Sequence, residues 1–324
     1  MAHAIRVHKY GGPEAMVYEE ITVADPGPGQ IRIKQTAIGV NFIDVYHRTG
    51  LYPQPAMPFI PGSEGAGVVT AIGPGVTLHK IGDRVAYAGA IGGYASERLM
   101  PADRAVRIPD GVDDTTAAGM MLQGMTVRYL IRKTYKCGPD TTVLWHAAAG
   151  GVGLIALQWL KHLGTTVIGT AGGPEKCALA KAAGATHVID YKSENFVDRV
   201  KELTGGRKCD VVYDSIGKDT FPASLDCLKP HGLFVTFGNA SGPIDAFNAG
   251  ILAAKGSLYM TRPTLGTYTA SRADLEETAN DLFDVVKRGI VKINVSKTYP
   301  LKDVAQCHRD LEGRKTTGSL VLIP

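Results

Sequence analysis

The chain has 324 residues, of which 35 are lysine or arginine and 31 are aspartate or glutamate, giving a net charge of +4. This length suggests two domains of about 150 residues each and allows a core that needs neither disulfides nor a structural metal. The charges are dispersed without a basic stripe, so we do not expect nucleic acid as a partner, and the lack of about 18 consecutive apolar residues excludes a membrane span.

The N-terminus and the cysteines indicate the compartment. Residues 1–12 hold no apolar stretch long enough for a signal peptide. The five cysteines are Cys137, Cys177, Cys209, Cys227 and Cys307. Their odd number and wide spacing favour neither a disulfide framework nor a C-x-x-C zinc site. We therefore expect reduced, mostly buried thiols in a cytoplasmic protein.

The first part of the chain, to about Arg107, is typical of short strands separated by glycine and proline. We expect strands at Ile31–Gln35, Ala66–Ile72, Gly82–Tyr87 and Tyr94–Met100. One helix interrupts them, from Asn41 to Arg48, and Gly50 closes it. This pattern predicts a small antiparallel barrel or sandwich.

From about Asp113 helices and strands alternate. Asp113–Asp114 can cap a helix that continues, with a break, through Met120 to Lys136. Five strands are expected at 142–146, 165–170, 187–189, 210–214 and 233–237, and four helices at 151–163, 174–183, 194–203 and 220–228. A further strand is expected at 257–260. Parallel strands need such crossover helices, so this region predicts a Rossmann-like doubly wound parallel sheet and an α/β fold.

After Arg262 the pattern is mixed again. Amphipathic helices are expected at Arg272–Arg288 and Leu301–Leu311, followed by a terminal strand at Ser319–Ile323. The parallel-sheet segment is therefore inserted into the first domain. We divide the chain into a mostly-β domain at 1–120, a dinucleotide-binding domain at 121–262, and a return to the first domain at 263–324.

The most informative motif is a glycine-rich turn between a strand and a helix. Gly150, Gly151, Val152 and Gly153 follow the strand that starts at Val143. Gly150 and Gly153 occupy the second and third glycine positions of G-x-G-x-x-G, while Ala148 replaces the first glycine. Small residues there let the backbone approach a pyrophosphate at a helix N-terminus. In this strand–turn–helix setting the motif predicts a dinucleotide cofactor.

The residues after the next strand distinguish the two nicotinamide nucleotides. NAD sites usually place a carboxylate about 20 residues after the glycines, where it accepts hydrogen bonds from the ribose. Here Thr170 is followed by Ala171 and two glycines, and Lys176 lies in the first turn of the next helix. A missing acid removes repulsion of a 2′-phosphate, and a lysine attracts it. NADPH is therefore the expected cofactor.

The whole chain resembles the zinc-independent NADPH:quinone oxidoreductases of the medium-chain dehydrogenase/reductase superfamily. The resemblance rests on residues 11–14, 39–44, 50–53, 61–67, 146–153, 212–215, 237–239 and 261–263. It implies a GroES-like catalytic domain, a Rossmann cofactor domain, an active-site cleft between them and a homodimer. It also implies a small-molecule quinone as substrate.

The resemblance also explains why no metal is expected. Zinc alcohol dehydrogenases bind catalytic zinc through a cysteine and a histidine, whose positions are occupied here by Asn41 and Ser63, and only Glu64 remains. Neutral amide and hydroxyl groups are poor zinc ligands. His47 is the one nearby alternative ligand, and a histidine without partners is more often structural. Without zinc, alkoxide formation is poorly supported, whereas a reduced quinone delocalises its own charge.

The candidate substrate residues lie in the first domain. Tyr46 and Tyr52 would form an apolar wall for a planar acceptor, and Asn41 and Gln123 could donate hydrogen bonds to ligand oxygens. By resemblance the cofactor contacts are Asn41, Thr126, Gly150, Gly151, Val152, Gly153, Gly172, Lys176, Tyr191, Phe237, Gly238, Asn239, Arg262 and Arg314. Arg262 and Arg314 would pair with phosphates.

Two other functions stay open on the same fold. One is an NADPH-dependent reductase of activated carbon–carbon double bonds, which needs a proton donor such as Tyr52. The other is a non-catalytic protein, because some relatives are lens structural proteins or bind RNA. The glycine turn and the absence of a basic cluster argue against RNA as the primary partner.

Overall fold

The computed structural model describes residues 1–313 and 315–324, so Arg314, one of the predicted cofactor contacts, lies outside the described residues. The chain forms two compact units. Unit 1 comprises Met1–Met125, Tyr268–Lys287 and Ile293–Pro324, and unit 2 comprises Thr126–Thr267 and Arg288–Lys292. The boundaries lie a few residues after positions 120 and 262, and the segment 288–292 packs with unit 2.

Unit 1 is built on strands. They are β1 (Ala2–Val7), β2 (Met16–Ile21), β3 (Gln30–Val40), β4 (Glu64–Ile72), β5 (Arg84–Ala88), β6 (Glu97–Pro101), β7 (Val106–Arg107), β14 (Val295–Pro300) and β15 (Ser319–Ile323). β1 and β2 form an antiparallel pair, and the others form one sheet in the order β14-β15-β3-β4-β5-β7, with β6 also paired to β3. β14 and β15 are parallel, while β15, β3, β4, β5 and β7 pair antiparallel. The C-terminal strand therefore completes the sheet of the N-terminal domain.

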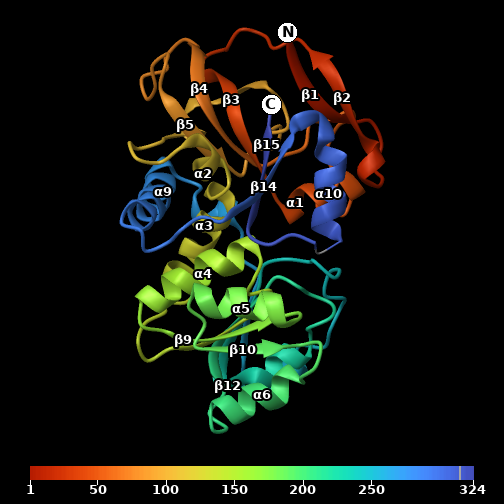
Figure 1. The fold of residues 1–324 in the computed structure, drawn as a ribbon, viewed down its shortest axis with the longest axis vertical. Helices are drawn as coiled ribbons and strands as arrows, with labels where there is room; N and C mark the ends of the chain where they lie inside the picture. The colour runs from red at the N-terminus through yellow and green to blue at the C-terminus, as the bar shows by residue number, and fades with distance from the viewer. Residues whose placement is uncertain (314) are drawn as a thin grey trace. The chain divides into compact units, whose positions relative to one another are not determined.

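Short helices connect and cover these strands. They are α1 (Phe42–Thr49), α2 (Asp114–Ala118), α9 (Arg272–Lys287), α10 (Val304–Glu312), and the 3-10 turns η1 (Pro13–Ala15), η2 (Ala102–Arg104) and η5 (Leu301–Asp303). Asn41 is the N-cap residue of α1, and Gly50 ends it in the left-handed conformation at φ 83°. Arg48 of α1 forms an ion pair with Glu312 of α10, which lies beside α1 in Figure 1. Asn41 is thereby fixed where β3 ends.

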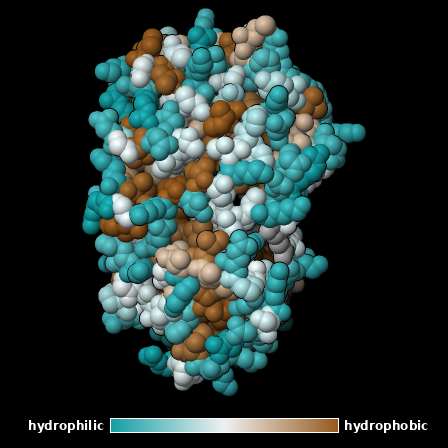
Figure 2. Space-filling model, viewed as in Figure 1, coloured by the Kyte–Doolittle hydropathy of each residue, from teal (hydrophilic) through white to brown (hydrophobic). Residues whose placement is uncertain are grey.

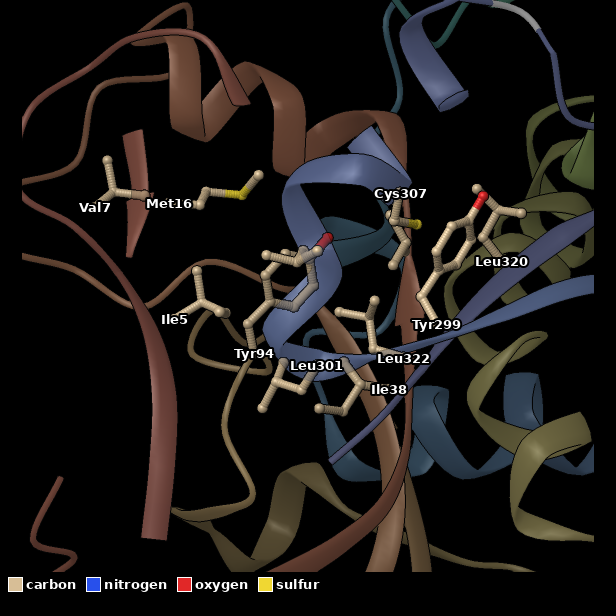
Figure 3. Packing of buried hydrophobic residues seen from close by; sticks show 12 residues of the cluster. Ile5, Val7, Met16, Ile38, Tyr94, Tyr299, Leu301, Cys307, Leu320 and Leu322 are labelled. Carbon is tan, nitrogen blue, oxygen red and sulfur yellow. The ribbon is translucent and has the colours of Figure 1, made fainter. Parts of the chain in front are cut away.

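One hydrophobic cluster of unit 1 joins both ends of the chain. Figure 3 shows Ile5 from β1, Ile38 from β3 and Leu322 from β15 near Tyr94, with Leu320 from β15 beside Tyr299 in the same cluster. These residues lie far apart in the sequence, and Ile5, Ile38, Leu320 and Leu322 each expose 2% or less of their surface to solvent. Their burial stabilises the return of the C-terminal segment to the first domain.

Unit 2 contains a parallel sheet of β8 (Thr142–Trp145), β9 (Thr166–Ala171), β10 (His187–Asp190), β11 (Cys209–Asp214), β12 (Leu228–Thr236) and β13 (Tyr259–Thr261). The strand order is β10-β9-β8-β11-β12-β13. This is the 3-2-1-4-5-6 order of a Rossmann domain, in which ligands bind where the order reverses, between the first and fourth strands. The predicted doubly wound parallel sheet is confirmed.

The helical segments of unit 2 are α4 (Gly151–His162), α5 (Pro174–Ala183), α6 (Phe196–Leu203), α7 (Gly250–Ala254), η4 (Ala223–Cys227) and the π-helical turn η3 (Leu130–Thr134). Helices α3 (Met121–Tyr129) and α8 (Leu265–Tyr268) cross the unit boundaries. α4 and α5 pack against each other and on β9, and they lie side by side in Figure 1. Each crossover therefore returns the chain to a parallel neighbour.

Several element predictions were wrong. The helix expected at 220–228 is only the 3-10 turn η4, because Pro222 lacks an N–H and cannot occupy a helix interior. β12 then begins at Leu228, earlier than expected. The broken helix expected after Asp113 is confirmed: Asp113 caps it, it divides at Gly119, and it ends in the turn η3 at Thr134. Strand β14 was missed, because only Tyr299 in it is buried and its apolar periodicity is weak.

One face of the molecule shows how polar and apolar residues are distributed on the surface. Hydrophilic residues cover most of the face drawn in Figure 2, with smaller apolar areas between them. None of the helices in the described ranges is long and apolar enough to cross a membrane.

Candidate active site

The glycine-rich turn of unit 2 leads from β8 into α4. Gly150 is the N-cap residue of α4, and none of the side chains in residues 1–313 and 315–324 caps the first amides of the helix. A Cβ at Gly153 would lie 2.5 Å from the Ala147 oxygen and 2.6 Å from the Ala148 oxygen, so the close approach requires glycine. Gly151 and Val152 form the first turn, where both are half-buried. Open helix amides beside a close-packed turn suit a pyrophosphate.

A second turn, after β9, contains Gly172. A Cβ there would lie 2.5 Å from the hydroxyl oxygen of Tyr191, so Gly172 and Tyr191 are in contact range. Lys176 lies half-buried on α5, two residues after Pro174, which begins that helix. The structure thus brings together three predicted contacts for the adenosine end: Gly172, Lys176 on the adjoining helix turn, and the exposed Tyr191.

Asp190, the last residue of β10, bonds to this turn and was missed by sequence reasoning. Its Oδ1 accepts hydrogen bonds from the N–H of Gly173 at 2.9 Å and from the N–H of Lys192 at 3.0 Å. These bonds lower the pKa of Asp190. The carboxylate comes from the end of β10, not of β9, and it holds the two turns together. Its only sequence signal was its place at the end of the third strand.

The remaining cofactor candidates of unit 2 lie at the ends of other elements. Phe237 follows β12, and its ring centroid is 5.7 Å from that of Trp145. Arg262 donates through Nη1 to the Gly238 oxygen at 3.0 Å, which ties the predicted segment 237–239 to the end of β13. Asn239 is half-buried beside them, as is Thr126 within α3.

In unit 1 the predicted Asn41 and Gln123 are bonded to each other. Gln123 Nε2 donates to Asn41 Oδ1 at 3.1 Å, and Asn41 Nδ2 donates to Glu64 Oε1 at 2.7 Å. Ser319 Oγ donates to Gln123 Oε1 at 2.9 Å, and the Leu122 N–H donates to Glu64 Oε2 at 2.5 Å. Each of the two amide groups keeps one further N–H, which can donate to a ligand oxygen.

Ser63 and Asp44 form a neighbouring network. Ser63 Oγ donates to Asp44 Oδ1 at 3.1 Å, and Tyr94 donates its hydroxyl to Asp44 Oδ2 at 2.9 Å. The Tyr94 oxygen also lies 3.0 Å from Nε2 of His308. Burial raises the pKa of Asp44 to about 6 and lowers the pKa of His308 to about 3, with Arg48 adding to the latter effect.

These bonds leave no zinc site of the alcohol dehydrogenase type. Asn41 and Ser63, at the two ligand positions, are neutral groups that already hydrogen-bond to the carboxyls of Glu64 and Asp44. Within residues 1–313 and 315–324, no three histidine, cysteine or acidic side chains are grouped so that they could hold a metal ion. The donor set present does not fit the metal.

The two predicted tyrosines are in contact. Tyr46 on α1 and Tyr52 after it have ring centroids 5.2 Å apart in an edge-on arrangement. The backbone N–H of Tyr52 donates to the backbone carbonyl oxygen of Tyr46 at 3.0 Å. The ring of Phe42 lies 6.1 Å from Tyr46, and that of His47 lies 6.2 Å from Tyr52. Burial lowers the pKa of His47. The group forms an aromatic cluster within unit 1, in which Tyr46 is buried and Tyr52 is half-buried.

Glu64 has the most perturbed carboxyl of this network. Burial raises its pKa from 4.5 to about 8, although the Leu122 and Asn41 donors oppose the shift. A carboxyl with a raised folded-state pKa stabilises the fold below pH 4.5 and loses that contribution as the pH rises through about 8. Between pH 5 and pH 8, we expect the free energy of unfolding of the wild type to fall by on the order of 3 kcal/mol relative to that of Glu64→Gln. Denaturant unfolding at both pH values measures this.

The change in the free energy of unfolding with pH is the relevant quantity, because glutamine loses one hydrogen bond of Glu64 at every pH and so shifts the stability by a constant amount. The exposed Glu20 on β2 gives a matched control, and Glu20→Gln should keep the pH dependence of the wild type. If the free energy of unfolding varies with pH in the same way for wild type and Glu64→Gln, Glu64 is ionised throughout this range.

Comparisons with known proteins cover the chain from end to end. Residues 27–110 match the family model for the alcohol dehydrogenase GroES-like domain, and residues 151–284 match that for zinc-binding dehydrogenase. A quinone oxidoreductase of Pseudomonas aeruginosa is 51% identical over 100% of both chains. A 2-haloacrylate reductase of Burkholderia is 46% identical over 100% of this chain and 99% of its own.

A solved structure gives the same result for the fold. The quinone oxidoreductase of Escherichia coli in complex with NADPH is 50% identical and superposes with a TM-score of 0.98 over 99% of this chain and 100% of that one. The predicted combination of a GroES-like domain and a Rossmann domain is therefore confirmed.

Proposed function

Because this chain belongs to the quinone oxidoreductases of the medium-chain dehydrogenase/reductase superfamily, we propose that it reduces quinones with NADPH and without a metal. The observation that carries this function is the full-length identity of 51% to a quinone oxidoreductase. NADPH is the cofactor, as in the similar Escherichia coli structure. Asn41 and Ser63 at the zinc-ligand positions agree with chemistry that needs no Lewis acid.

The residues of unit 2 fit a dinucleotide phosphate. The uncapped amides that begin α4 would bind the pyrophosphate, and the close approach at Gly153 admits no side chain. Lys176 and Tyr191 would hold the 2′-phosphate, with Arg262, Arg314 and the segment 237–239 as further contacts. NADPH, when bound, supplies the hydride. The contribution of these residues is binding and orientation.

The residues of unit 1 would hold the quinone. The half-buried ring of Tyr52, backed by the buried ring of Tyr46, would pack against the quinone, and the remaining N–H groups of Asn41 and Gln123 would donate to carbonyl oxygens. The Glu64 and Ser319 bonds orient these two amides before the substrate arrives. Because a reduced quinone spreads its charge over the ring, positioning is the main contribution to the rate.

The similar 2-haloacrylate reductase makes reduction of activated double bonds the second candidate. Steady-state NADPH oxidation with a benzoquinone and with an alkenal separates the two, in the presence of a chelator. We expect rapid, chelator-insensitive quinone reduction. Negligible quinone turnover beside rapid alkenal turnover would overturn the proposal.

Substitution of Tyr52 tests the role of its ring. Tyr52→Phe should keep most quinone activity, because only the hydroxyl is lost. Tyr52→Ala should raise the apparent KM for quinone by an amount equivalent to about 1–3 kcal/mol, since the ring no longer covers the acceptor. Steady-state kinetics with both substrate classes measures these effects.

The control for ring loss is Tyr18→Ala, at an exposed position on β2. It should leave both activities unchanged. The double-bond function requires the opposite pattern, in which Tyr52→Phe alone impairs alkenal turnover because a proton donor is missing.

We propose that the protein is a homodimer. Among the described strands, β13 pairs only with β12 and so lies at one edge of the sheet of unit 2. Its Tyr259 is 63% exposed, and exposed edges pair readily with another strand. Light scattering should give a dimer for the wild type and a shift toward monomer for Tyr259→Lys. A monomeric wild type would contradict the proposal.

A cytoplasmic location is proposed from the cysteines. All five are free thiols, and four of them are buried. Reduced thiols of this kind are typical of a reducing compartment.

A further inference from the structure

A continuous chain of side-chain hydrogen bonds begins at the residue that precedes the glycine-rich turn. Nδ1 of His146 lies 3.0 Å from Oγ1 of Thr170, and its Nε2 lies 3.0 Å from Oγ of Ser224. Ser224 in turn lies 3.2 Å from Oδ2 of Asp214. All four side chains are 2% exposed or less. The function proposed above uses none of them.

The carboxylate of Asp214 determines which group donates in each of these hydrogen bonds. Asp214 can only accept, so Ser224 donates to it and must itself accept from the Nε2–H of His146. The other ring nitrogen, Nδ1, is then unprotonated and accepts from the Thr170 hydroxyl. Burial lowers the pKa of His146, which favours this neutral ring. One tautomer therefore satisfies the whole chain.

These hydrogen bonds join three neighbouring strands at their carboxyl ends. His146 directly follows β8, Thr170 lies near the end of β9, and Asp214 ends β11. These strands are adjacent in the sheet, and β8 and β11 flank the point where the strand order reverses. Phe196 of α6 covers the His146 ring edge-on at 5.1 Å. The His146 side chain is thus held on three sides.

The next residue, Ala147, needs such support. Its φ of 53° lies in the left-handed region, which is unfavourable for a residue with a Cβ. This conformation begins the turn: the Ala147 oxygen accepts from the Gly150 N–H at 3.0 Å, and the Ala148 N–H donates to the Thr170 oxygen at 2.9 Å. A strained backbone conformation persists only where the surrounding structure holds it in place. Here the His146 side chain holds the residue before Ala147, and the Thr170 backbone oxygen holds the residue after it.

We propose that His146, Thr170 and Ser224 are positioning residues for the dinucleotide, which hold the turn at Ala147 so that the α4 amides face the pyrophosphate. The inference rests on the proposed function. These residues act through the backbone of the turn and touch neither substrate. Their loss weakens NADPH binding and leaves the quinone step unchanged once the cofactor is saturating.

The test removes one hydroxyl at a time, with Thr170→Val and Ser224→Ala. We expect each to raise the Kd and the KM for NADPH by about tenfold, the effect of one lost hydrogen bond. The kcat at saturating NADPH and the KM for quinone should stay within about twofold of the wild type. Thr170→Ser restores the hydroxyl and should restore the affinity.

The matched control is Thr278→Val. Thr278 on α9 is 1% exposed, and its hydroxyl has no hydrogen-bond partner among the described residues, so its removal should leave NADPH affinity unchanged. All variants are measured at a temperature where thermal unfolding shows them folded. Unchanged NADPH affinity in Thr170→Val, with a lower Tm alone, would overturn the inference, as would a fall in kcat at constant affinity. A wild type that binds no NADPH would instead refute the proposed function itself.

Discussion

Replacing Gly153 with alanine should reduce NADPH affinity by at least about 100-fold, equivalent to about 3 kcal/mol. The added Cβ would lie 2.5 Å and 2.6 Å from the backbone oxygens of Ala147 and Ala148. Backbone atoms cannot rotate away as a flexible side chain can, so the start of α4 must move from the turn. The amides that would bind the pyrophosphate move with it. Calorimetric or fluorescence titration with NADPH measures the loss.

Gly138→Ala is the control for this substitution. Gly138 belongs to the same unit, and a Cβ there would meet nothing within 4 Å. It should bind NADPH like the wild type. Gly153→Ala will also lower the free energy of unfolding, so circular dichroism must show that the variant is folded at the titration temperature. Wild-type affinity in a folded Gly153→Ala would place the pyrophosphate away from this turn.

Replacing Lys176 with alanine should narrow the preference for NADPH over NADH by about 10- to 100-fold. A charged hydrogen bond to a 2′-phosphate contributes about 1.5–3 kcal/mol, and NADH has no such phosphate. The affinity for NADH should therefore stay nearly constant while that for NADPH falls. Titration of wild type and variant with both nucleotides gives the ratio.

Lys181→Ala removes the same charge from the same helix. The Lys181 ammonium donates to the Thr186 oxygen at 2.6 Å, so it is already used in a local contact. This control should keep the nucleotide preference of the wild type. Equal weakening of NADPH and NADH by Lys176→Ala would mean that Lys176 does not contact the 2′-phosphate.

A carboxylate that does not follow β9 in the sequence nevertheless lies at the turn after β9. The sequence correctly places no carboxylate at the end of β9, yet Asp190 reaches the same turn from β10. It accepts N–H donors of Gly173 and Lys192, so its oxygen Oδ1 is already engaged with the backbone. Asp190 therefore fixes the turns that carry Gly172 and Tyr191.

The sequence by itself determined the features that depend on short-range patterns. The turn from Gly150 to Gly153 needs only a strand, small residues and a helix start, and all three stand within one continuous segment. The alternation of strands and helices predicts the parallel sheet for the same reason, since each crossover is local. The Asn41 cap and Gly50 stop of α1 are local as well.

Only the tertiary structure decided which distant side chains meet and how their burial changes them. Gln123 and Ser319 are 196 positions apart, and β3 and β15 must pair before they can bond. The raised pKa of Glu64 depends on complete burial, which no local pattern reveals. β14 could not be predicted because its place is set by pairing with β15, rather than by its own few apolar residues. Register and packing are long-range properties, so these parts of the site exist only in the folded chain.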